Sequence, residues 1–470
     1  MHFINSKKLA RPFFSWVIFF ALTICSQIVL SIGLFPGGDT TSLQNVNRNS
    51  YSHPSSNMEI SNVGDFQLGN ALFRRQWSTG KSSSNSVDGL GPLFNSRSCQ
   101  SCHLKDGRGH PPFSGITQSN SLVIQLQDSE NNDNGDDAYG NQLQPFAAPG
   151  LHGEGQLSVF YEELVFRYPD DAEIILHKPN YNVSQLADGP LGKNTVLSPR
   201  IAPQMIGVGL LEAIEEEDIL RQQDPDDINR DGISGRANFG YSLVNKRSML
   251  GRFGWKASAP TIADQTAVAF SVDMGLSTPL IRVNHGDCTA QQSSCLELAL
   301  FTQDTHEDTE VSQEILDLVV FYSQNLAVPE SRVEDQQRFT AGRDLFNKIG
   351  CESCHTQRYV TSRIVLSNPH FEKQIIFPYT DLLLHDMGEA LADRSAHGFA
   401  QASEWRTSPL WGIGLAKIVN PNARYLHDGR AGSIEEAILW HDGEGLNARS
   451  NFVGLSVEQR QKVLYFLRSL

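Results

Sequence analysis

The chain has 470 residues, of which 40% are hydrophobic and 19% are charged, with 38 Gly and 21 Pro. This length and composition predict two or three loop-rich globular domains with buried cores, and they exclude a disordered chain. The formal net charge of -15 excludes non-specific binding to nucleic acid or anionic lipid; it serves solubility or attracts a basic partner.

The first 35 residues predict export. A positively charged start (KKLAR) precedes an almost wholly apolar stretch, about long enough to span a bilayer. No clean small-x-small cleavage site follows, so a cleaved signal and an uncleaved anchor over residues 12–35 both stay open. Either one places the body of the protein in the periplasm. Residues 36–60 are rich in Ser, Asn and Gly and predict a linker.

Secondary structure beyond the linker changes type along the chain. Residues 62–94 should be partly helical. Alternating apolar residues predict strands at Leu122–Leu126 and Leu157–Tyr161, with an acidic loop at Asp128–Asp137 between them. Helical spacing of apolar residues then recurs at Ile206–Ile219, Val311–Asn325, Gln337–Phe346 and Ser456–Leu470.

Two Cys-x-x-Cys-His motifs carry the clearest chemical signal. They consist of Cys99, Cys102 and His103, and of Cys351, Cys354 and His355. The two thiols of such a motif add across the vinyl groups of a haem, and the adjacent His becomes the proximal iron ligand. A zinc site would need two further ligands per motif, and no second CxxC or HxxxH is spaced to supply them. The sequence therefore predicts two covalently bound haems c.

The two motifs also predict the domain organisation. We expect a mainly α fold with two cytochrome c-like haem domains, an N-terminal one over residues 61–330 and a C-terminal one over residues 333–470. The predicted strands place a β-containing insertion at about residues 120–190, inside the N-terminal domain.

The other cysteines predict a disulfide. Of the seven, four lie in the haem motifs and Cys25 lies in the export segment. The remaining pair, Cys288 and Cys295, should close a small disulfide loop in an exported chain.

A short acidic segment has the layout of a calcium loop. Asp227, Asn229 and Asp231 alternate in the pattern D-x-N-x-D-G, which wraps oxygen ligands around a hard cation, with the backbone oxygen of Ile233 as a further ligand. Asn238 replaces the usual bidentate Glu at the twelfth position, so affinity should be low. A metal-free turn is the alternative.

Several further blocks resemble a known superfamily. Thr407–Gly412, Tyr425–Ala431 and Ser433–Ala437 are similar to the bacterial dihaem cytochrome c peroxidases. Within that superfamily, the chain looks like the dihaem oxidoreductase, or putative peroxidase, family, sometimes labelled thiol oxidoreductase. The blocks typical of this family are Asp88–Pro92, Asp106–Gly109 and Pro378–Leu382. The resemblance covers nearly everything after residue 60.

The resemblance implies a sixth ligand for the C-terminal haem. Dihaem peroxidases place a Met just after the Glu-Glu-Ala helix, and relatives that oxidise a partner protein place a Tyr there. His441 occupies that position here, and Met387 is the rival ligand. Two imidazoles would give the C-terminal haem a lower potential than His/Met ligation.

The resemblance also implies catalytic residues. Trp255 would be the electron bridge between the haems, and Gln265 and Asp273 would be the distal polar pair over the haem held by His103. A buried carboxylate can move a proton between the two oxygens of peroxide. Asp stands where the superfamily has Glu and the spacing is shorter, so a capping Asp and a buried Trp are the alternative reading.

The sixth ligand of the N-terminal haem stays open in the sequence. The candidates are His110, His152, Met205 and Met274, and an open or displaceable site is the preferred interpretation.

These features predict an exported dihaem c-type oxidoreductase of the peroxidase type. It would reduce peroxide or a similar oxidant at the N-terminal haem, with electrons relayed from the C-terminal haem and supplied by a small cytochrome or cupredoxin. The alternatives are a non-enzymatic electron-transfer cytochrome and a haem oxidase that acts on a protein partner. His441 in place of Tyr argues against the last.

Overall fold

The computed structural model describes residues 34–79, 89–112, 120–130, 135–302, 309–393 and 400–470. The predicted export segment at residues 1–35 therefore lies almost entirely outside the described residues. Within the described ranges, no helix is both long enough and apolar enough to cross a membrane.

The prediction of a mainly α fold with cytochrome c-like domains is wrong. Helices make up 32% of the structure and strands 19%, the latter in one three-stranded sheet (β3-β2-β7) and several two-stranded sheets. Many of these strands have only two to four residues. Such short strands carry no alternating pattern that a sequence can show, because their conformation depends on the partner strand.

The helices, in chain order, are α2 (Val63–Arg74), α3 (Cys99–Cys102), α4 (Val208–Glu212), α5 (Glu216–Leu220), α6 (Ile262–Val268) with a π-helical continuation (Ala269–Asp273), α7 (Ser293–Thr302), α8 (Gln313–Gln324), α9 (Gln336–Lys348), α10 (Ala416–Val419), α11 (Ile434–Leu439), α12 (Leu446–Val453) and α13 (Val457–Ser469). The strands are β1 (Leu93–Phe94), β2 (Leu122–Asp128), β3 (Gln142–Leu143), β4 (Phe146–Ala147), β5 (Gln156–Arg167), β6 (Glu173–Ser184), β7 (Thr195–Ile201), β8 (Phe239–Ser242), β9 (Arg247–Leu250), β10 (Tyr359–Val360), β11 (Ile375–Ile376), β12 (Leu384–Asp386) and β13 (Glu404–Arg406).

The longer predicted elements are confirmed. The strands predicted at Leu122–Leu126 and Leu157–Tyr161 lie within β2 and β5, and the three later helical segments correspond to α8, α9 and α13. Ser456 caps α13 with a reciprocal bond to Gln459, which explains why this amphipathic helix begins where it does. The segment at Ile206–Ile219 instead forms the two short helices α4 and α5.

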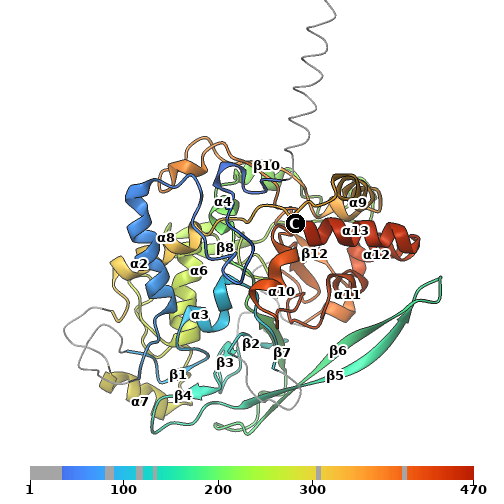
Figure 1. The fold of residues 1–470 in the computed structure, drawn as a ribbon. Coiled ribbons are helices and arrows are strands. Elements are labelled where there is room, and N and C mark those ends of the chain that lie inside the picture. The colour runs from blue at the N-terminus through green and yellow to red at the C-terminus, as the bar shows by residue number, and fades with distance from the viewer. Residues whose placement is uncertain (1–33, 80–88, 113–119, 131–134, 303–308, 394–399) are drawn as a thin grey trace, which may run out of the picture.

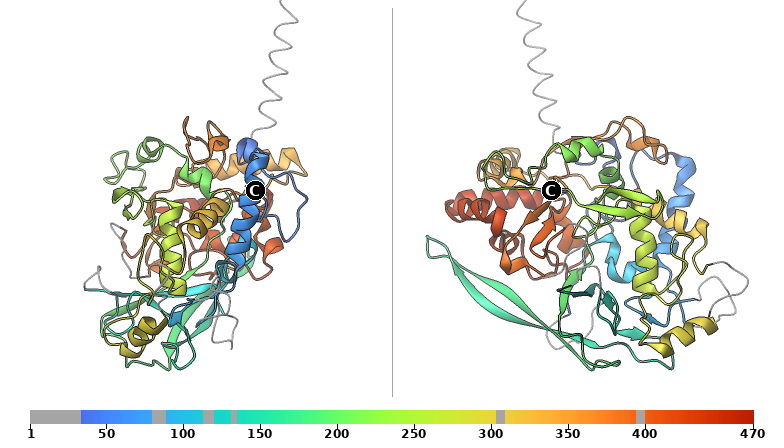
Figure 2. Two further views of the ribbon diagram at one scale, coloured as in Figure 1. Left: turned by 90° about the vertical axis from the view of Figure 1, so that its left-hand side faces the viewer. Right: turned by 180° about the vertical axis from the view of Figure 1, so that it is seen from behind.

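The helices gather into two groups (Figure 1). Helices α2, α6 and α8 lie together on one side of the molecule, and α9, α11, α12 and α13 lie on the other, as the view from behind also shows (Figure 2). The long hairpin β5–β6 runs beneath the second group. Its Tyr168 donates to Glu435 of α11 (2.9 Å), so the insertion packs against the C-terminal half of the chain. The division into domains stays a prediction.

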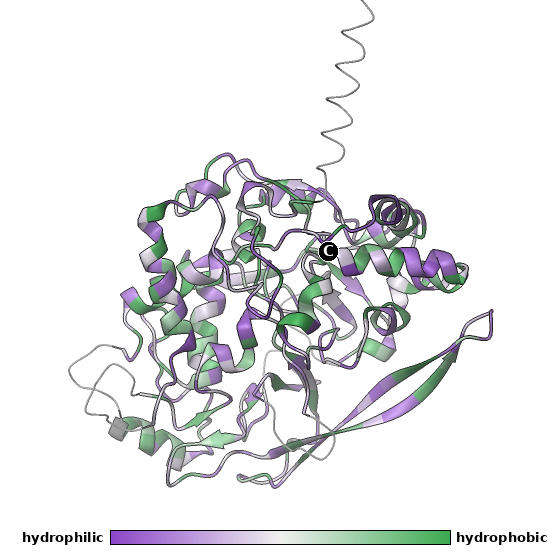
Figure 3. Cartoon of the chain, viewed as in Figure 1, coloured by the Kyte–Doolittle hydropathy of each residue, from purple (hydrophilic) through white to green (hydrophobic). Residues whose placement is uncertain are grey.

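One helix pair packs beside the first Cys-x-x-Cys-His motif. Phe66 and Phe73 of α2 contact Tyr322 of α8, with ring centroids 4.9 and 5.3 Å apart. Gly69 lies between the two Phe residues at the point where the helices cross. Figure 3 shows α2 carrying both hydrophobic and hydrophilic residues, as a helix packed on one face does.

A second helix pair repeats this packing beside the second motif. Phe339 and Phe346 of α9 contact Phe466 of α13, with centroids 5.2 and 5.3 Å apart, and Gly342 lies at the crossing. The first helices of the two pairs, α2 and α9, share the sequence Phe-x-x-Gly-x-x-Leu-Phe. Each haem motif is therefore preceded by a helix with the same packing residues. The sequence prediction did not include this short repeat.

The glycine at each crossing should be irreplaceable. A Cβ at Gly342 would lie 2.1 Å from the backbone oxygen of Lys462, closer than any packed contact allows. We expect Gly342→Ala to lower the free energy of unfolding by about 1–3 kcal/mol, as overpacking does. Gly64→Ala in α2 is the control: a Cβ there meets nothing within 4 Å, so this change should stabilise by up to about 1 kcal/mol. Urea unfolding measures both, and equal effects would contradict the close crossing.

Candidate haem sites

Each Cys-x-x-Cys-His motif presents its His in the same way. Nδ1 of His103 lies 2.8 Å from the backbone oxygen of Pro203, and Nδ1 of His355 lies 2.9 Å from that of Tyr379. A ring that donates from Nδ1 to a carbonyl keeps the Nε2 lone pair for a metal. Burial lowers the pKa of both imidazoles to about 4, so both are neutral at neutral pH. Both rings are thus ready to bind iron.

The two motifs differ in their local backbone. The first forms the short helix α3, capped by Ser98, whose hydroxyl accepts from the Ser101 amide (3.2 Å). The second forms a single 3-10 turn, Cys351–Ser353, which follows Gly350 with a φ of 95°. Either conformation keeps the two cysteines of a motif on one side of the chain, as attachment to a haem requires.

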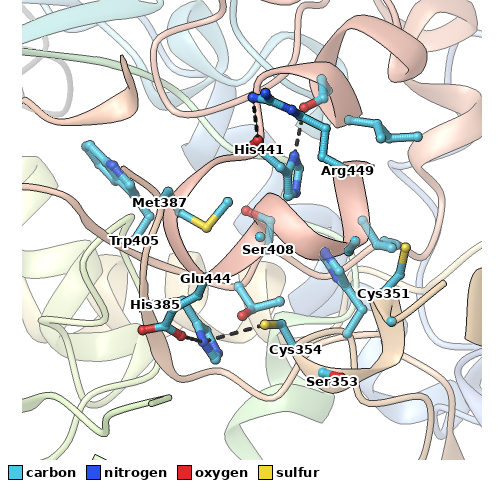
Figure 4. Close-up of a pocket in the computed structure, with 18 of the residues that line it drawn as sticks. Cys351, Ser353, Cys354, His385, Met387, Trp405, Ser408, His441, Glu444 and Arg449 are labelled. Carbon is cyan, nitrogen blue, oxygen red and sulfur yellow. Dashed lines mark hydrogen bonds and ion pairs between the residues drawn. The ribbon is translucent and has the colours of Figure 1, made fainter. Parts of the chain in front are cut away.

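A cavity of about 330 Å³ opens beside the second motif (Figure 4). Cys351, Cys354 and His355 contribute to its wall, together with apolar side chains such as Phe346 and Leu410. The volume is within the range of ligand pockets. Two thiols, a neutral imidazole and apolar walls are the set of groups that a covalently bound haem needs. The residues present therefore fit this cofactor.

Both candidate sixth ligands reach this cavity. The Cε of Met387 and the Cδ2 of His441 each lie 3.3 Å from where a Cβ on Gly445 would be, so the two side chains lie side by side (Figure 4). His441 directs Nδ1 to the backbone oxygen of Ala437 (2.8 Å), and burial lowers its pKa. Its Nε2 is therefore available, but the geometry does not exclude Met387. The choice of His441 stays a prediction.

An ion-pair network that our sequence analysis missed lies beside Cys354. Nε2 of His385 lies 2.7 Å from Asp381 and Nδ1 lies 2.5 Å from Glu444. Burial opposes protonation of His385, but the Asp381 carboxylate outweighs it, and the pKa of His385 is raised well above its usual value. Its Nδ1 is also 3.5 Å from the Cys354 sulfur. This network holds the loop that leads to Met387.

Trp255 lines the same C-terminal cavity. Its Nε1 donates to the backbone oxygen of Ile201 in β7 (2.8 Å), which connects it to the N-terminal half of the chain. Trp405 and His427 stack beside it, with ring centroids 3.6 Å apart, and His427 lies 6.4 Å from Trp255. Trp255 is therefore placed at the boundary between the two halves, against the C-terminal site.

Asp273 lies beside the first motif. Burial first, and the Asp273 carboxylate second, raise the pKa of both the Cys99 and Cys102 thiols. Burial also raises the pKa of Asp273 itself to about 6. The amide of Gln142 in β3 donates to its carboxylate (2.7 Å).

Gln265 does not join this group. It lies in α6, eight residues before Asp273, which corresponds to about 12 Å along a helix. Its Oε1 instead lies 3.8 Å from where a Cβ on Gly254 would be. The amide partner of Asp273 is thus Gln142, which no sequence motif marks because strand pairing brings it into place.

The candidate sixth ligands of the N-terminal haem separate by environment. Met274 is 2% exposed, and both Met274 and Met205 pack in the apolar cluster that includes Cys99. Nδ1 of His110 lies 2.8 Å from the backbone oxygen of Pro111, and His152 is exposed. Of the four, only the two methionines share the described apolar cluster of Cys99, and none is singled out as a ligand.

The predicted calcium loop forms an exposed turn, with Gly232 at a φ of 82°. The carboxylates of Asp227 and Asp231 accept backbone N–H groups within the loop. The buried Asn238 at the twelfth position donates to the backbone oxygen of Lys256. The twelfth position therefore supplies no carboxylate to the loop.

Calcium binding stays a prediction, and the absence of a bidentate Glu at the twelfth position sets its expected strength. We expect a dissociation constant no tighter than about 10⁻⁴–10⁻³ M, the range of weak calcium modules. Calorimetric titration with Ca²⁺ measures it, and Asp231→Asn should abolish the heat. Equal binding by the variant would assign the heat to another site.

Cys288 and Cys295 are joined by a disulfide with their Cα atoms 6.4 Å apart. The cysteines of the two Cys-x-x-Cys-His motifs are the free cysteines of the described chain. They are therefore the thiols that the described residues offer to a cofactor.

Comparison with protein families identifies a family whose model matches most of the chain. The family described as "Di-haem oxidoreductase, putative peroxidase" matches residues 34–131 and 144–470. Comparison with curated proteins finds no significant match. The family match includes both Cys-x-x-Cys-His motifs, the C-terminal cavity and Asp273.

Proposed function

Because the chain belongs to the di-haem oxidoreductase, putative peroxidase family, we propose that it reduces peroxide or a similar small oxidant with electrons from a periplasmic carrier. Membership of the family implies haem cofactors and oxidoreductase chemistry. The proposal adds the attachment sites, the direction of electron flow and the oxidant. Export by residues 1–35 is part of it, because haem c is attached outside the cytoplasmic membrane.

The proposed attachment uses both motifs. One haem is bound through Cys99 and Cys102, the other through Cys351 and Cys354, and His103 and His355 are the proximal ligands. The matched Nδ1 hydrogen bonds of the two His residues support this assignment, because they fix the tautomer that leaves Nε2 toward the metal.

The proposed electron path runs from the C-terminal haem through Trp255 to the N-terminal haem. The position of Trp255 supports it, because its ring lines the C-terminal cavity while its Nε1 bonds to β7 of the N-terminal half. A small cationic cytochrome or cupredoxin is the proposed donor, since a chain with a net charge of -15 attracts it.

The observation that carries the peroxidase proposal is the Asp273 carboxylate. Reduction of peroxide to water consumes protons as well as electrons, and the bound haem iron would supply the redox chemistry. Asp273 is the group that would move the proton. Its pKa of about 6 lets it accept and return a proton near neutral pH, and Gln142 holds its Oδ1 in place. Gln265 is dropped from the proposed pair because it lies against Gly254.

Electron paramagnetic resonance of the oxidised holoprotein, before and after half-reduction, tests the proposal. A high-spin ferric signal beside a low-spin one is expected, because the N-terminal iron should have an open site. Two low-spin signals that persist through half-reduction would contradict it. They would favour a non-enzymatic electron-transfer cytochrome, for which the buried Met274 near Cys99 is the specific support.

A further inference from the structure

Two buried guanidinium groups lie on the wall of the C-terminal cavity. Arg108 and Arg406 are 5% and 8% exposed, and both line the cavity. They are also close enough to interact: burial lowers the pKa of Arg406 to about 10, the Asp381 carboxylate opposes this shift, and the positive charge of Arg108 adds to it. Two positive charges, both buried from water, therefore lie on the same wall of the cavity.

Neither guanidinium forms an ion pair with a carboxylate of the described chain, although the more distant Asp381 carboxylate acts on Arg406 electrostatically. Their hydrogen bonds go only to backbone carbonyl oxygens, and Nη1 of Arg108 and Nη2 of Arg406 make none. The acceptors are the oxygens of Arg424 (3.0 Å) and Leu426 (3.3 Å) for Arg108, and those of Gly254 (2.9 Å) and Thr407 (3.3 Å) for Arg406. Each group thus keeps one nitrogen free.

Other buried cations nearby are neutralised. Arg200 and Lys256 both pair with Asp393, at 3.4 and 3.2 Å, and Arg430 pairs with Asp428 at 2.9 Å. Burying a charge is costly unless an opposite charge and hydrogen bonds compensate it. The fold supplies that compensation at these sites. Arg108 and Arg406 have no such ion pair on the cavity wall, which indicates that a ligand brings the compensating anion.

Both Arg108 and Arg406 contact Trp255. The Arg108 guanidinium carbon lies 5.6 Å from the centroid of the Trp255 ring, and the Arg406 amide donates to the Trp255 backbone oxygen (2.9 Å). The missing anion would therefore lie beside Trp255, in the same cavity as Cys351 and Cys354.

A haem carries a pair of propionate carboxylates, and a guanidinium is well suited to bind a carboxylate with two parallel hydrogen bonds. We propose that Arg108 and Arg406 bind the propionates of the C-terminal haem. The inference rests on the proposed attachment of that haem at Cys351, Cys354 and His355. It also implies that the C-terminal haem is held by both halves of the chain, because Arg108 follows His103 of the first motif by five residues.

Redox potentiometry of the holoprotein tests the pair. A nearby cation stabilises the reduced haem relative to the more positive oxidised one. Arg108→Gln and Arg406→Gln should each lower the reduction equilibrium constant of the C-terminal haem at least tenfold, about 59 mV for one electron. The N-terminal haem should change less. Arg406→Lys keeps the charge, so the potential of the C-terminal haem should stay close to its wild-type value.

Arg252→Gln is the matched control. Arg252 is buried and also bonds only to backbone oxygens, those of Leu211 and Ile214, but it does not line the cavity. The charges of Glu212 and Glu216 offset its own. Its replacement should leave both potentials unchanged. Shifts as large as those of the cavity variants would mean that any buried Arg acts in this way, and would overturn the proposal.

Infrared difference spectra of protein carrying ¹³C-propionate haem give a direct second readout. The propionate bands should shift in Arg108→Lys and Arg406→Lys, variants that keep the buried charge and so are the most certain to fold. Unshifted bands, with two haems per chain, would overturn the propionate assignment alone. One haem per chain in the wild-type protein would instead overturn the attachment on which both proposals rest.

Discussion

Asp273→Asn should lower peroxide turnover by about 10²–10⁴-fold while both haems stay bound, because that is the range that a general acid–base group contributes. The variant keeps an Oδ1 that can accept from Gln142, so the position of the side chain is retained and the proton transfer is removed. Steady-state turnover with a reduced cytochrome donor measures the loss, and the haem absorbance confirms the cofactor content.

The pH profile of the wild-type protein should show the same group. Asp273 accepts a proton only as the carboxylate, so turnover should rise with pH through an apparent pKa near 6. This rise should be absent from the residual activity of Asp273→Asn. A rise of equal size in the variant would assign the titration to another group.

Stability should change in the opposite direction from activity. Burial raises the pKa of Asp273 from 3.8 to about 6 in the folded chain. The folded state therefore binds the proton more tightly, so this stabilisation is complete below about pH 4 and is lost as the pH rises through 6. At pH 7 the buried charge is a net cost, and Asp273→Asn should unfold at a higher temperature than the wild type. Lost turnover then cannot be ascribed to unfolding.

Asp106→Asn is the control for Asp273. Asp106 is also buried, also near the first motif, and burial likewise raises its pKa to about 6. Its carboxylate is occupied by the hydroxyls of Ser52 and Tyr322. Turnover should survive this change, and Asp273→Glu, which keeps a carboxylate, should also retain it. Full turnover in Asp273→Asn would remove the residue from the mechanism.

His441→Ala should convert the C-terminal haem from a low-spin to a high-spin ferric signal, because it removes the proposed sixth ligand. Met387→Leu should leave that signal unchanged. The midpoint potential gives a second measurement: if Met387 takes the vacant position, the potential should rise, as exchange of imidazole for thioether favours reduced iron. Axial ligands span roughly 0.8 V, so the change should be easily measured.

The reverse result has a clear meaning. Loss of the low-spin signal in Met387→Leu, with His441→Ala unaffected, would assign the ligand to Met387. Both side chains lie within 3.3 Å of where a Cβ on Gly445 would be, and both line the cavity, so either assignment is compatible with it.

The sequence by itself determined the features that depend on neighbours along the chain. The two Cys-x-x-Cys-His motifs, the family resemblance, and the helices α9 and α13 could all be predicted, because their residues are consecutive or repeat with a helical period. The fold class could not. Strands such as β3 and β10 have two residues each and exist only where a distant strand offers hydrogen-bonding groups.

The tertiary structure decided which residues meet. It brought Gln142 to Asp273 across 131 positions and left Gln265, on the same helical segment as Asp273, against Gly254. It also placed Arg108, five residues after the first haem motif, and Arg406 on one wall of the C-terminal cavity. No local pattern predicts such pairs, because the free energy of burying a charge or an amide depends on what the rest of the fold places beside it.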